Sequence, residues 1–247
     1  SSSPDFIDFL NSESSSQNDQ FLNKKRRKNI ISNLEKKFKK LKPEAINQSN
    51  WNNYKEFHQE EYTIKKIKKI QEFADNIKNL TKIVDLGSNL TTKEVQNINL
   101  RIDNDLFTCR KMRQTYDDKQ IILLIDIADW LCHFENQEDN PLNCAGAARG
   151  AVIAGLMHHL IIDCGLNIDL FYERISNLYD HVLLEFPSED DPMVKLLIRK
   201  TNEVISWEWE SNHLPACKKY FKILSSTNLS DTRKIFILQN KKYKNNE

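Results

Sequence analysis

Glycine is scarce in this chain: only 5 of its 247 residues are Gly. Tight strand-to-helix turns depend on Gly, so the scarcity counts mildly against a fully equipped cofactor site in an α/β enzyme. Long apolar runs are also missing, because no stretch approaches the roughly 18 residues of a membrane-spanning helix, and no signal-peptide pattern is present. The sequence therefore predicts a protein without membrane contact and with a cytoplasmic location.

Cysteine is present in a number that does not suit a disulfide framework. The five cysteines are Cys109, Cys132, Cys144, Cys164 and Cys217. Their number is odd, and no two of them form the C-x-x-C pair of a zinc or redox site. We therefore expect reduced thiols and no metal site.

Charge is balanced over the whole chain, with 36 Lys and Arg against 35 Asp and Glu. The net charge of +1 gives no general argument for a nucleic-acid partner. Residues 24–42 differ, because they carry many lysines and arginines and Glu35 as their one acid. This segment either binds a polyanion or a protein partner, or forms a solvated helix face. Its KKRRK run at 24–28 is similar to a nuclear-localisation signal.

Three segments follow from the composition along the chain. Residues 1–20 are rich in Ser, Asp and Asn and predict a disordered tail. Residues 21–80 predict a basic and aromatic helical extension, with helices over 21–42 and about 51–73. Residues 81–247 alternate short apolar runs with helical patterns and predict an α/β domain.

Six apolar runs in the last segment predict strands. They are residues 82–89, 97–105, 120–130, 151–162, 181–187 and 231–240, the fourth running into a helix. Helical patterns at 168–179 and 191–205 lie between the later runs. The predicted fold class is therefore α/β, with a doubly wound, mostly parallel sheet.

Candidate ligand-binding residues, most of them polar, follow most of these runs, where an open α/β sheet binds its ligand. They are Asp85, Gly87, Asp103, Asp126, His158, His159 and Glu185. If the ligand is a nucleoside, Gly87 allows close backbone approach, and Asp103 accepts bonds from both ribose hydroxyls. Asp126 accepts from the adenine amine, and the Ile127 amide faces a ring nitrogen. Each carboxylate also has a simpler alternative. Asp85 could be a structural residue that fixes the turn, and Asp103 could be a solvated residue at the end of a strand.

The motifs IVDLGSN (83–89), RIDND (101–105) and LLIDIADW (123–130) resemble those of class I S-adenosylmethionine (SAM) methyltransferases. The closest resemblance is to a bacterial nodulation-type subfamily, through WNNYKEFHQEEY (51–62), LMHHLII (156–162) and LLEFPSEDDPMV (183–194). It covers roughly residues 43–240. The resemblance implies a Rossmann-like fold and a SAM cofactor bound by the first motif, Asn89 included. It also implies that Tyr54 and Trp51 lie in a segment that covers the cofactor.

The chain departs from the family pattern at three places. Thr91 stands where the family has a second Gly, the stretch from Asp85 to Asp103 is short, and Gly150 replaces an Asp before the fourth strand. Three functions therefore stay open. The first is a SAM-dependent methyltransferase acting on an oxygen or nitrogen acceptor of unknown identity. The second is a catalytically inactive, methyltransferase-like subunit of a larger complex. The third, less favoured by the balanced charge, is a methyltransferase that acts on RNA or DNA and contacts phosphates through residues 21–42.

The candidate catalytic residues have alternatives as well. His158 or His159 either lines the acceptor pocket as base or hydrogen-bond partner, or is packed. Neither has the spacing of a metal ligand. Glu185 either meets a cationic substrate or belongs to the acidic loop that leads to Asp191. Trp207 and Trp209 either cover a substrate or pack in the core.

Overall fold

The computed structural model describes residues 60–77, 82–88, 95, 97–105, 108–109, 112–113, 121–133, 148–201 and 205–243. All of them lie in the part of the chain from Gln48 to Glu247. The predictions for residues 1–20 and 21–42 fall outside these residues. So do those for Trp51, Tyr54, Asn89 and Thr91.

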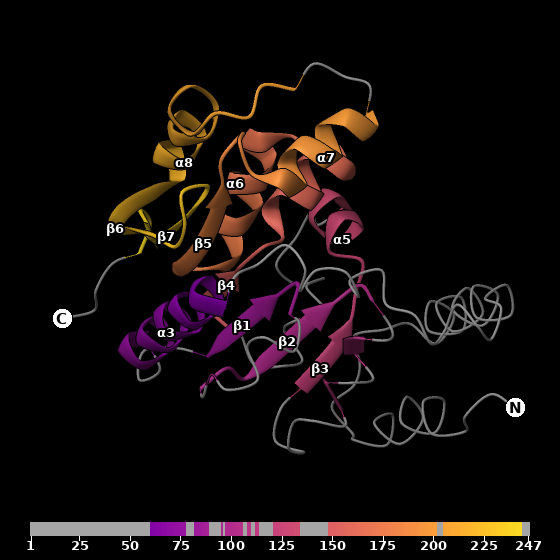
Figure 1. Cartoon of the computed structure of the whole chain (residues 1–247). Helices are drawn as coiled ribbons and strands as arrows, with labels where there is room; N and C mark the ends of the chain where they lie inside the picture. Colours follow the sequence, from indigo (N-terminus) through magenta and orange to yellow (C-terminus); the bar gives the residue numbers. More distant parts are fainter. Residues whose placement is uncertain are drawn as a thin grey trace, which may run out of the picture. The chain divides into compact units, whose positions relative to one another are not determined.

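A single seven-stranded sheet organises the described residues, in the order β3-β2-β1-β4-β5-β7-β6 (Figure 1). The strands are β1 (Ile83–Leu86), β2 (Leu100–Asp103), β3 (Ile121–Leu124), β4 (Gly150–Ile153), β5 (His181–Pro187), β6 (Phe221–Asn228) and β7 (Arg233–Asn240). The first five pair in parallel, and β7 is antiparallel to both β5 and β6. This confirms the predicted doubly wound, mostly parallel sheet.

Helices join these strands. They are α3 (Glu60–Ile77), α5 (Ile127–His133), α6 (Ile168–Leu178), α7 (Pro192–Thr201) and α8 (Leu214–Tyr220), with short π-helices η7 (His159–Asp163) and η8 (Trp209–His213). Helix α6 begins where the Asn167 side chain accepts from the amides of Asp169 and Leu170, a typical N-cap. The predicted helices at 168–179 and 191–205 are thus confirmed as α6 and α7.

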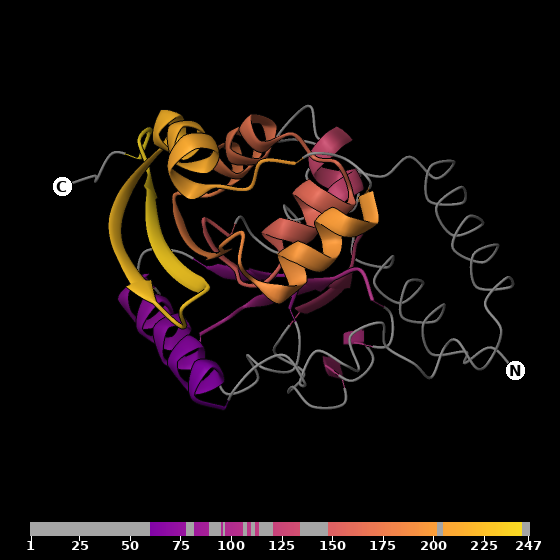
Figure 2. The same ribbon diagram turned by 45° about the horizontal axis from the view of Figure 1, so that its top comes forward.

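The sheet separates two apolar cores. Helix α3 packs Ile70, Phe73 and Ala74 against Ile83, Val152 and Leu183 on one face. Helices α5 to α8 cover the opposite face, against strand residues such as Val84, Ala151 and Leu184 (Figure 2). Strand β5 is buried along its whole length, which explains its nearly continuous apolar sequence.

Two details differ from the sequence prediction. The apolar run 120–130 is not one strand, because β3 ends at Leu124 and α5 begins at Ile127. Strand β6 and helix α8 were not predicted at all. No helix among the described residues has both the length and the apolar character needed to cross a membrane.

Candidate functional site

The carboxyl ends of β1 and β4 meet where the strand order reverses. From β1 the chain proceeds outward to β2 and β3, and then returns to β4 on the other side of β1. In open α/β sheets a ligand binds in the crevice at this switch point. The predicted site residues that lie in described segments are near, or just after, the carboxyl ends of β1 to β5, so the fold brings them to one edge of the sheet.

The turn after β1 is held by hydrogen bonds to β2. Gly87 has φ of 70°, a left-handed conformation that Gly adopts without strain. The next residue, Ser88, donates its amide to the Ile102 carbonyl at 2.9 Å. Its hydroxyl donates to Asp85 Oδ2 at 2.8 Å. The turn therefore has one fixed path beside β2.

Asp85 is engaged within the sheet. Its buried carboxylate accepts from the guanidinium of Arg101, its partner on β2, at 3.2 Å. The same Nη1 of Arg101 also donates to the Ser88 hydroxyl at 3.3 Å. In this arrangement Asp85 anchors the turn, in line with its alternative role as a turn-fixing residue. Arg101 and Ser88 are site residues that sequence reasoning missed.

The space beside Gly87 is filled by Leu156, which follows β4. A Cβ added to Gly87 would lie 3.1 Å from the Leu156 Cβ and Cδ1 atoms. Real Cβ atoms rarely approach so closely, so a side chain at position 87 would have to displace Leu156. Gly87 thus serves close packing as well as the turn, and Leu156 borders the route by which a ligand would reach the Gly87 backbone.

Asp103 at the end of β2 is a buried carboxylate without an ion-pair partner among the described residues. It is 5% exposed, and its Oδ1 accepts the Asp105 amide at 2.7 Å. Burial, with the nearby charges of Asp105 and Asp85, raises the pKa of Asp103 to about 7 despite that hydrogen bond. A buried acceptor of this kind is stabilised when a ligand supplies hydrogen-bond donors.

Asp126 and Ile127 lie at the start of α5. The Asp126 side chain is exposed, and its Oδ1 accepts the Asp129 amide at 3.1 Å, so Asp126 caps this helix. Ile127 is buried at 2% exposure. Both residues therefore lie after β3, at the predicted edge of the sheet. One carboxylate oxygen of Asp126 is engaged in capping α5.

His158 and His159 follow β4 and enter η7. Their ring centroids are 4.3 Å apart. His158 is fully buried, and neither ring nitrogen has a hydrogen-bond partner in the described part of the chain. Burial lowers the pKa of His158 well below 6.5, and the nearby positive charge of Arg233 acts in the same direction. Burial also lowers the pKa of His159, to about 4. Both rings are neutral at physiological pH and can accept a hydrogen bond.

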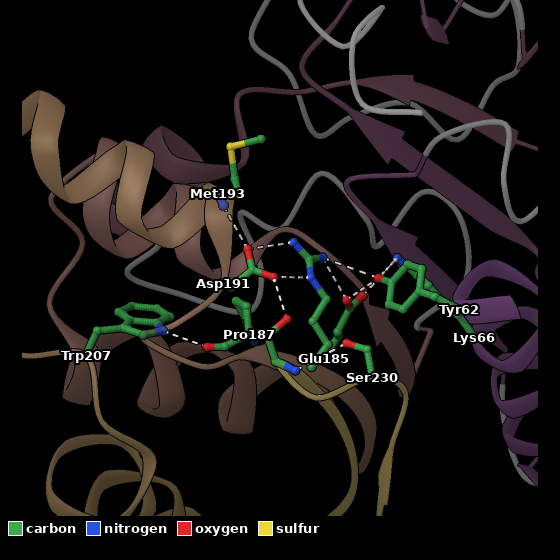
Figure 3. Close-up of polar contacts among 10 residues, drawn as sticks. Tyr62, Lys66, Glu185, Pro187, Asp191, Met193, Trp207 and Ser230 are labelled. Carbon is green, nitrogen blue, oxygen red and sulfur yellow. Dashed lines mark hydrogen bonds and ion pairs between the residues drawn. The ribbon is translucent and has the colours of Figure 1, made fainter. Parts of the chain in front are cut away.

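Glu185 lies in a buried ion cluster at the end of β5 (Figure 3). Its Oε2 is 2.8 Å from Lys66 Nζ of α3, and its Oε1 is 2.9 Å from Arg233 Nη1 of β7. The Tyr62 hydroxyl donates to the same Oε1. Although burial alone would raise the pKa of Glu185, Lys66 and Arg233 lower it below its ordinary value. Glu185 is therefore an ionised carboxylate held by three neighbours.

Arg233 extends this cluster to the start of α7. Its Nε and Nη2 donate to the two carboxylate oxygens of Asp191 at 2.7 and 3.1 Å. Asp191 Oδ1 in turn accepts the Met193 amide at 2.9 Å. The Arg233 guanidinium thus contacts Tyr62, Glu185 and Asp191, whereas Lys66 contacts Glu185 and Tyr62 (Figure 3). Sequence reasoning missed Tyr62, Lys66 and Arg233, since nothing in their local sequence links positions so far apart.

Trp207 and Trp209 pack in the apolar core. Trp207 is 2% exposed, donates its Nε1 hydrogen to the Pro187 carbonyl at 2.7 Å, and stacks on Phe186 at 5.6 Å between ring centroids. Trp209 stacks on Phe236 at 3.9 Å. The geometry fits the packing alternative for both residues.

Within the described residues, no group of three or more His, Cys, Asp and Glu side chains could hold a metal ion.

Comparison with known proteins gives structural neighbours only. No family model matches the chain, and no curated protein does. The 16S rRNA methylase ArmA has 14% identity, with 85% of this chain and 97% of that chain covered and a TM-score of 0.49. A putative methyltransferase from Thermobifida fusca YX has 15% identity, covering 73% and 80%, with a TM-score of 0.49.

A third neighbour is magnesium protoporphyrin IX methyltransferase (ChlM) from Synechocystis PCC 6803 with bound SAH. It has 9% identity, covering 80% of this chain and 97% of that one, with a TM-score of 0.46. Against WbdD, the chain spans only 40% of the longer protein's length. Several neighbours are thus methyltransferases by name. At such identities the likeness leaves the cofactor and acceptor to be inferred from the site residues, and the nodulation-type subfamily stays a prediction.

Proposed function

We propose that this protein is a SAM-dependent methyltransferase that acts on an oxygen or nitrogen acceptor. The observation that carries the proposal is Asp103, a buried carboxylate at the end of β2 beside the switch point. It accepts a backbone amide from Asp105 and has no ion pair among the described residues. A ribose with two adjacent hydroxyl donors matches what such a carboxylate needs.

The residues at this edge fit a nucleoside cofactor in a consistent order. Asp103 would hold the ribose, the Gly87–Ser88 turn would pass beside the cofactor, and Asp126 with the Ile127 amide would meet the adenine. When bound, SAM supplies an electrophilic methyl group on its sulfonium. The remaining task of the protein is to orient the acceptor and to exclude water.

The acceptor side would lie at the ends of β4 and β5. His158, neutral and without a hydrogen-bond partner in the described residues, is suited to accept from the acceptor's O–H or N–H group. Its lowered pKa makes it a weak base, so orientation of the acceptor is its better-supported role. His159 is the second candidate. Glu185 would have a structural role at the end of β5, since its carboxylate is already bound by three side chains.

A specific observation favours a second function, that of a methyltransferase-like subunit without activity. Leu156 occupies the space beside Gly87, where a cofactor would approach the backbone. Thr91, in place of a family Gly, points in the same direction, although it lies outside the described residues. In this case the chain would serve a larger assembly as an interaction protein, with the basic segment 24–42 as one contact.

Calorimetric titration of the full chain with SAM and with S-adenosylhomocysteine separates the two functions. Micromolar binding of both ligands, weakened at least about tenfold (about 1.4 kcal/mol) by Asp103→Asn, supports the enzyme. Absence of binding by a folded protein supports the inactive subunit. Equal affinity of wild type and a folded Asp103→Asn variant would contradict the ribose assignment.

A further inference from the structure

Two copies of a Lys-Lys-Tyr sequence lie near the end of the chain and have no part in the proposed methyl transfer. The first is Lys218–Tyr220, at the end of α8, and the second is Lys241–Tyr243, directly after β7. They are separated by the hairpin β6–β7. Between residues 214 and 243 the single acid is Asp231, so this region is strongly basic in a chain whose net charge is only +1.

The fold brings the two motifs together. The Lys241 amide donates to the Tyr220 carbonyl at 2.9 Å, and the Lys241 ammonium donates to the Lys218 carbonyl. Strand pairing of Phe221 with Asn240 fixes this register. In Figure 1, α8 lies beside the hairpin β6–β7 at one edge of the sheet.

Asn240 holds the second motif in its position. The buried Asn240 side chain donates to the carbonyls of Ser176 and Tyr179. Its Oδ1 accepts the Lys242 amide at 2.9 Å, and its carbonyl accepts the Tyr243 amide at 3.0 Å. These hydrogen bonds hold the backbone of Lys241–Tyr243 in a defined turn.

Most of the positive charge in this region is not neutralised. Lys219 pairs with Asp169 at 2.6 Å. Lys218, Lys222, Lys241 and Lys242 are exposed and make no ion pair with any described residue. A polar hollow of about 120 Å³ adjoins the second motif. It is lined by Arg149, Ser176, Asn177, Asp180, Asn240 and Lys242.

Aromatic rings are interleaved with these charges. Tyr220 and Tyr243 are both partly exposed. Tyr243 packs edge-on against His181, with ring centroids 4.7 Å apart, and the Tyr220 hydroxyl lies 3.4 Å from Asp169 Oδ2. Lysines that track a phosphate backbone, together with aromatic rings on which bases stack, are the features of surfaces that bind single-stranded nucleic acid.

We propose that the paired motifs Lys218–Tyr220 and Lys241–Tyr243, with Lys222, form a docking surface for single-stranded nucleic acid. The lysine ammonium groups would contact phosphates, and the two tyrosine rings would stack on bases. The surface lies at the amino-terminal ends of β4 and β5, because Gln239 at the end of β7 pairs with His181 at the start of β5. It is thus opposite the carboxyl-end site, and it does not depend on whether the chain methylates anything.

The test is fluorescence anisotropy of the full chain with a labelled oligonucleotide of about 15 thymidines, over a series of salt concentrations. We expect binding at low salt that weakens as salt rises. In Lys241→Gln/Lys242→Gln, the slope of log K against log salt should fall by about 0.7 for each lysine removed. Arg199→Gln/Lys200→Gln on α7 removes the same charge elsewhere and should leave the slope unchanged.

Tyrosine variants test base stacking, because they change the affinity for the oligonucleotide without changing the charge of the surface. Tyr243→Ala should weaken binding by about fivefold or more, the low end of one stacked base, while Tyr243→Phe should retain it. Photo-cross-linking should place the thymidines on the two motifs. Cross-links confined to residues 24–42, an unchanged salt slope in the lysine variant, or binding to anionic phospholipid vesicles but not to the oligonucleotide would each overturn the proposal.

Discussion

Lys66 on α3 and Glu185 on β5 form an ion pair of 2.8 Å, and their side chains are 5% and 0% exposed. The pair ties the helix that precedes the sheet to one of its central strands. A buried charge that loses its partner stays desolvated, so a broken pair costs more than an intact pair contributes. The Lys66–Glu185 contact is therefore a sensitive probe of how α3 is attached.

Lys66→Met should lower the free energy of unfolding by about 3–5 kcal/mol, because it leaves Glu185 with Arg233 as its one cation. Urea denaturation followed by circular dichroism measures the change. Lys65→Met is the matched control, since Lys65 pairs with Glu61 in an exposed i,i+4 contact. Equal midpoints for Lys66→Met and Lys65→Met would show that the buried pair does not stabilise the fold.

Glu185→Gln tests whether Glu185 is ionised in the folded protein, through the pH dependence of the free energy of unfolding. The folded-state pKa of Glu185 lies below the ordinary value of 4.5 for a glutamate, because Lys66 and Arg233 stabilise its ionised form. Its stabilising contribution is therefore present above about pH 4.5 and is lost as the pH falls through the folded value. The variant should be less stable than wild type at neutral pH, and the difference should narrow on acidification below about pH 4.5. A gap that widens there would contradict the ionised assignment.

The sequence predicted the parallel part of the sheet well for a physical reason. Strands β1, β4 and β5 are buried and largely apolar, so each stands out in the sequence. Strand β6 is at the edge of the sheet, and its residues 224–226, Leu-Ser-Ser, are all exposed. An edge strand with a polar sequence carries no such pattern, which is why β6 was missed.

The site shows the same limit. Asp85, Asp103 and Glu185 could be located because each lies at or near the carboxyl end of a strand, but their partners could not. Arg101 meets Asp85 through strand pairing, and Arg233 meets Glu185 across 48 residues of sequence. Whether a carboxylate is bound within the fold or is left for a ligand depends on such long-range partners. Local sequence therefore located the carboxylates and left open which of them a ligand could use.

Asp103→Asn should stabilise the free protein. The unfolded-state pKa is near 3.8 and the folded-state pKa is about 7. The folded form therefore loses stability relative to the unfolded chain as the pH rises from about 4 through about 7. The variant should gain about 2 kcal/mol at pH 8, half of what the full shift gives at about 1.4 kcal/mol per pKa unit. Thermal unfolding at several pH values measures this. No gain above about pH 7 would mean that Asp103 is not a desolvated acid.

The same residue predicts the pH dependence of cofactor binding. A ribose hydroxyl donates to the ionised carboxylate, so SAM affinity should rise between about pH 6 and pH 8 as Asp103 loses its proton. Calorimetric titration at the two ends of this range tests it. Asp103→Asn should bind more weakly and should show no such rise. A rise that persists in the variant would have to come from another group.

Leu156 decides how a cofactor can reach Gly87. Gly87→Ala should destabilise the protein by about 1–3 kcal/mol through its left-handed backbone alone. The added Cβ would also lie 3.1 Å from Leu156 and add a steric cost. In Gly87→Ala/Leu156→Ala, only the loss of stability due to that contact should be recovered, and the cost of the left-handed backbone should remain.

Leu156→Ala alone opens the space beside Gly87 without altering the turn. If Leu156 obstructs the cofactor, this variant should bind SAM more tightly than wild type, even though a half-buried side chain has been removed. If Leu156 instead forms the apolar wall on which the cofactor packs, affinity should fall, because apolar contact area is lost. The sign of the change in the titration therefore distinguishes a site that Leu156 partly closes from a site that Leu156 completes.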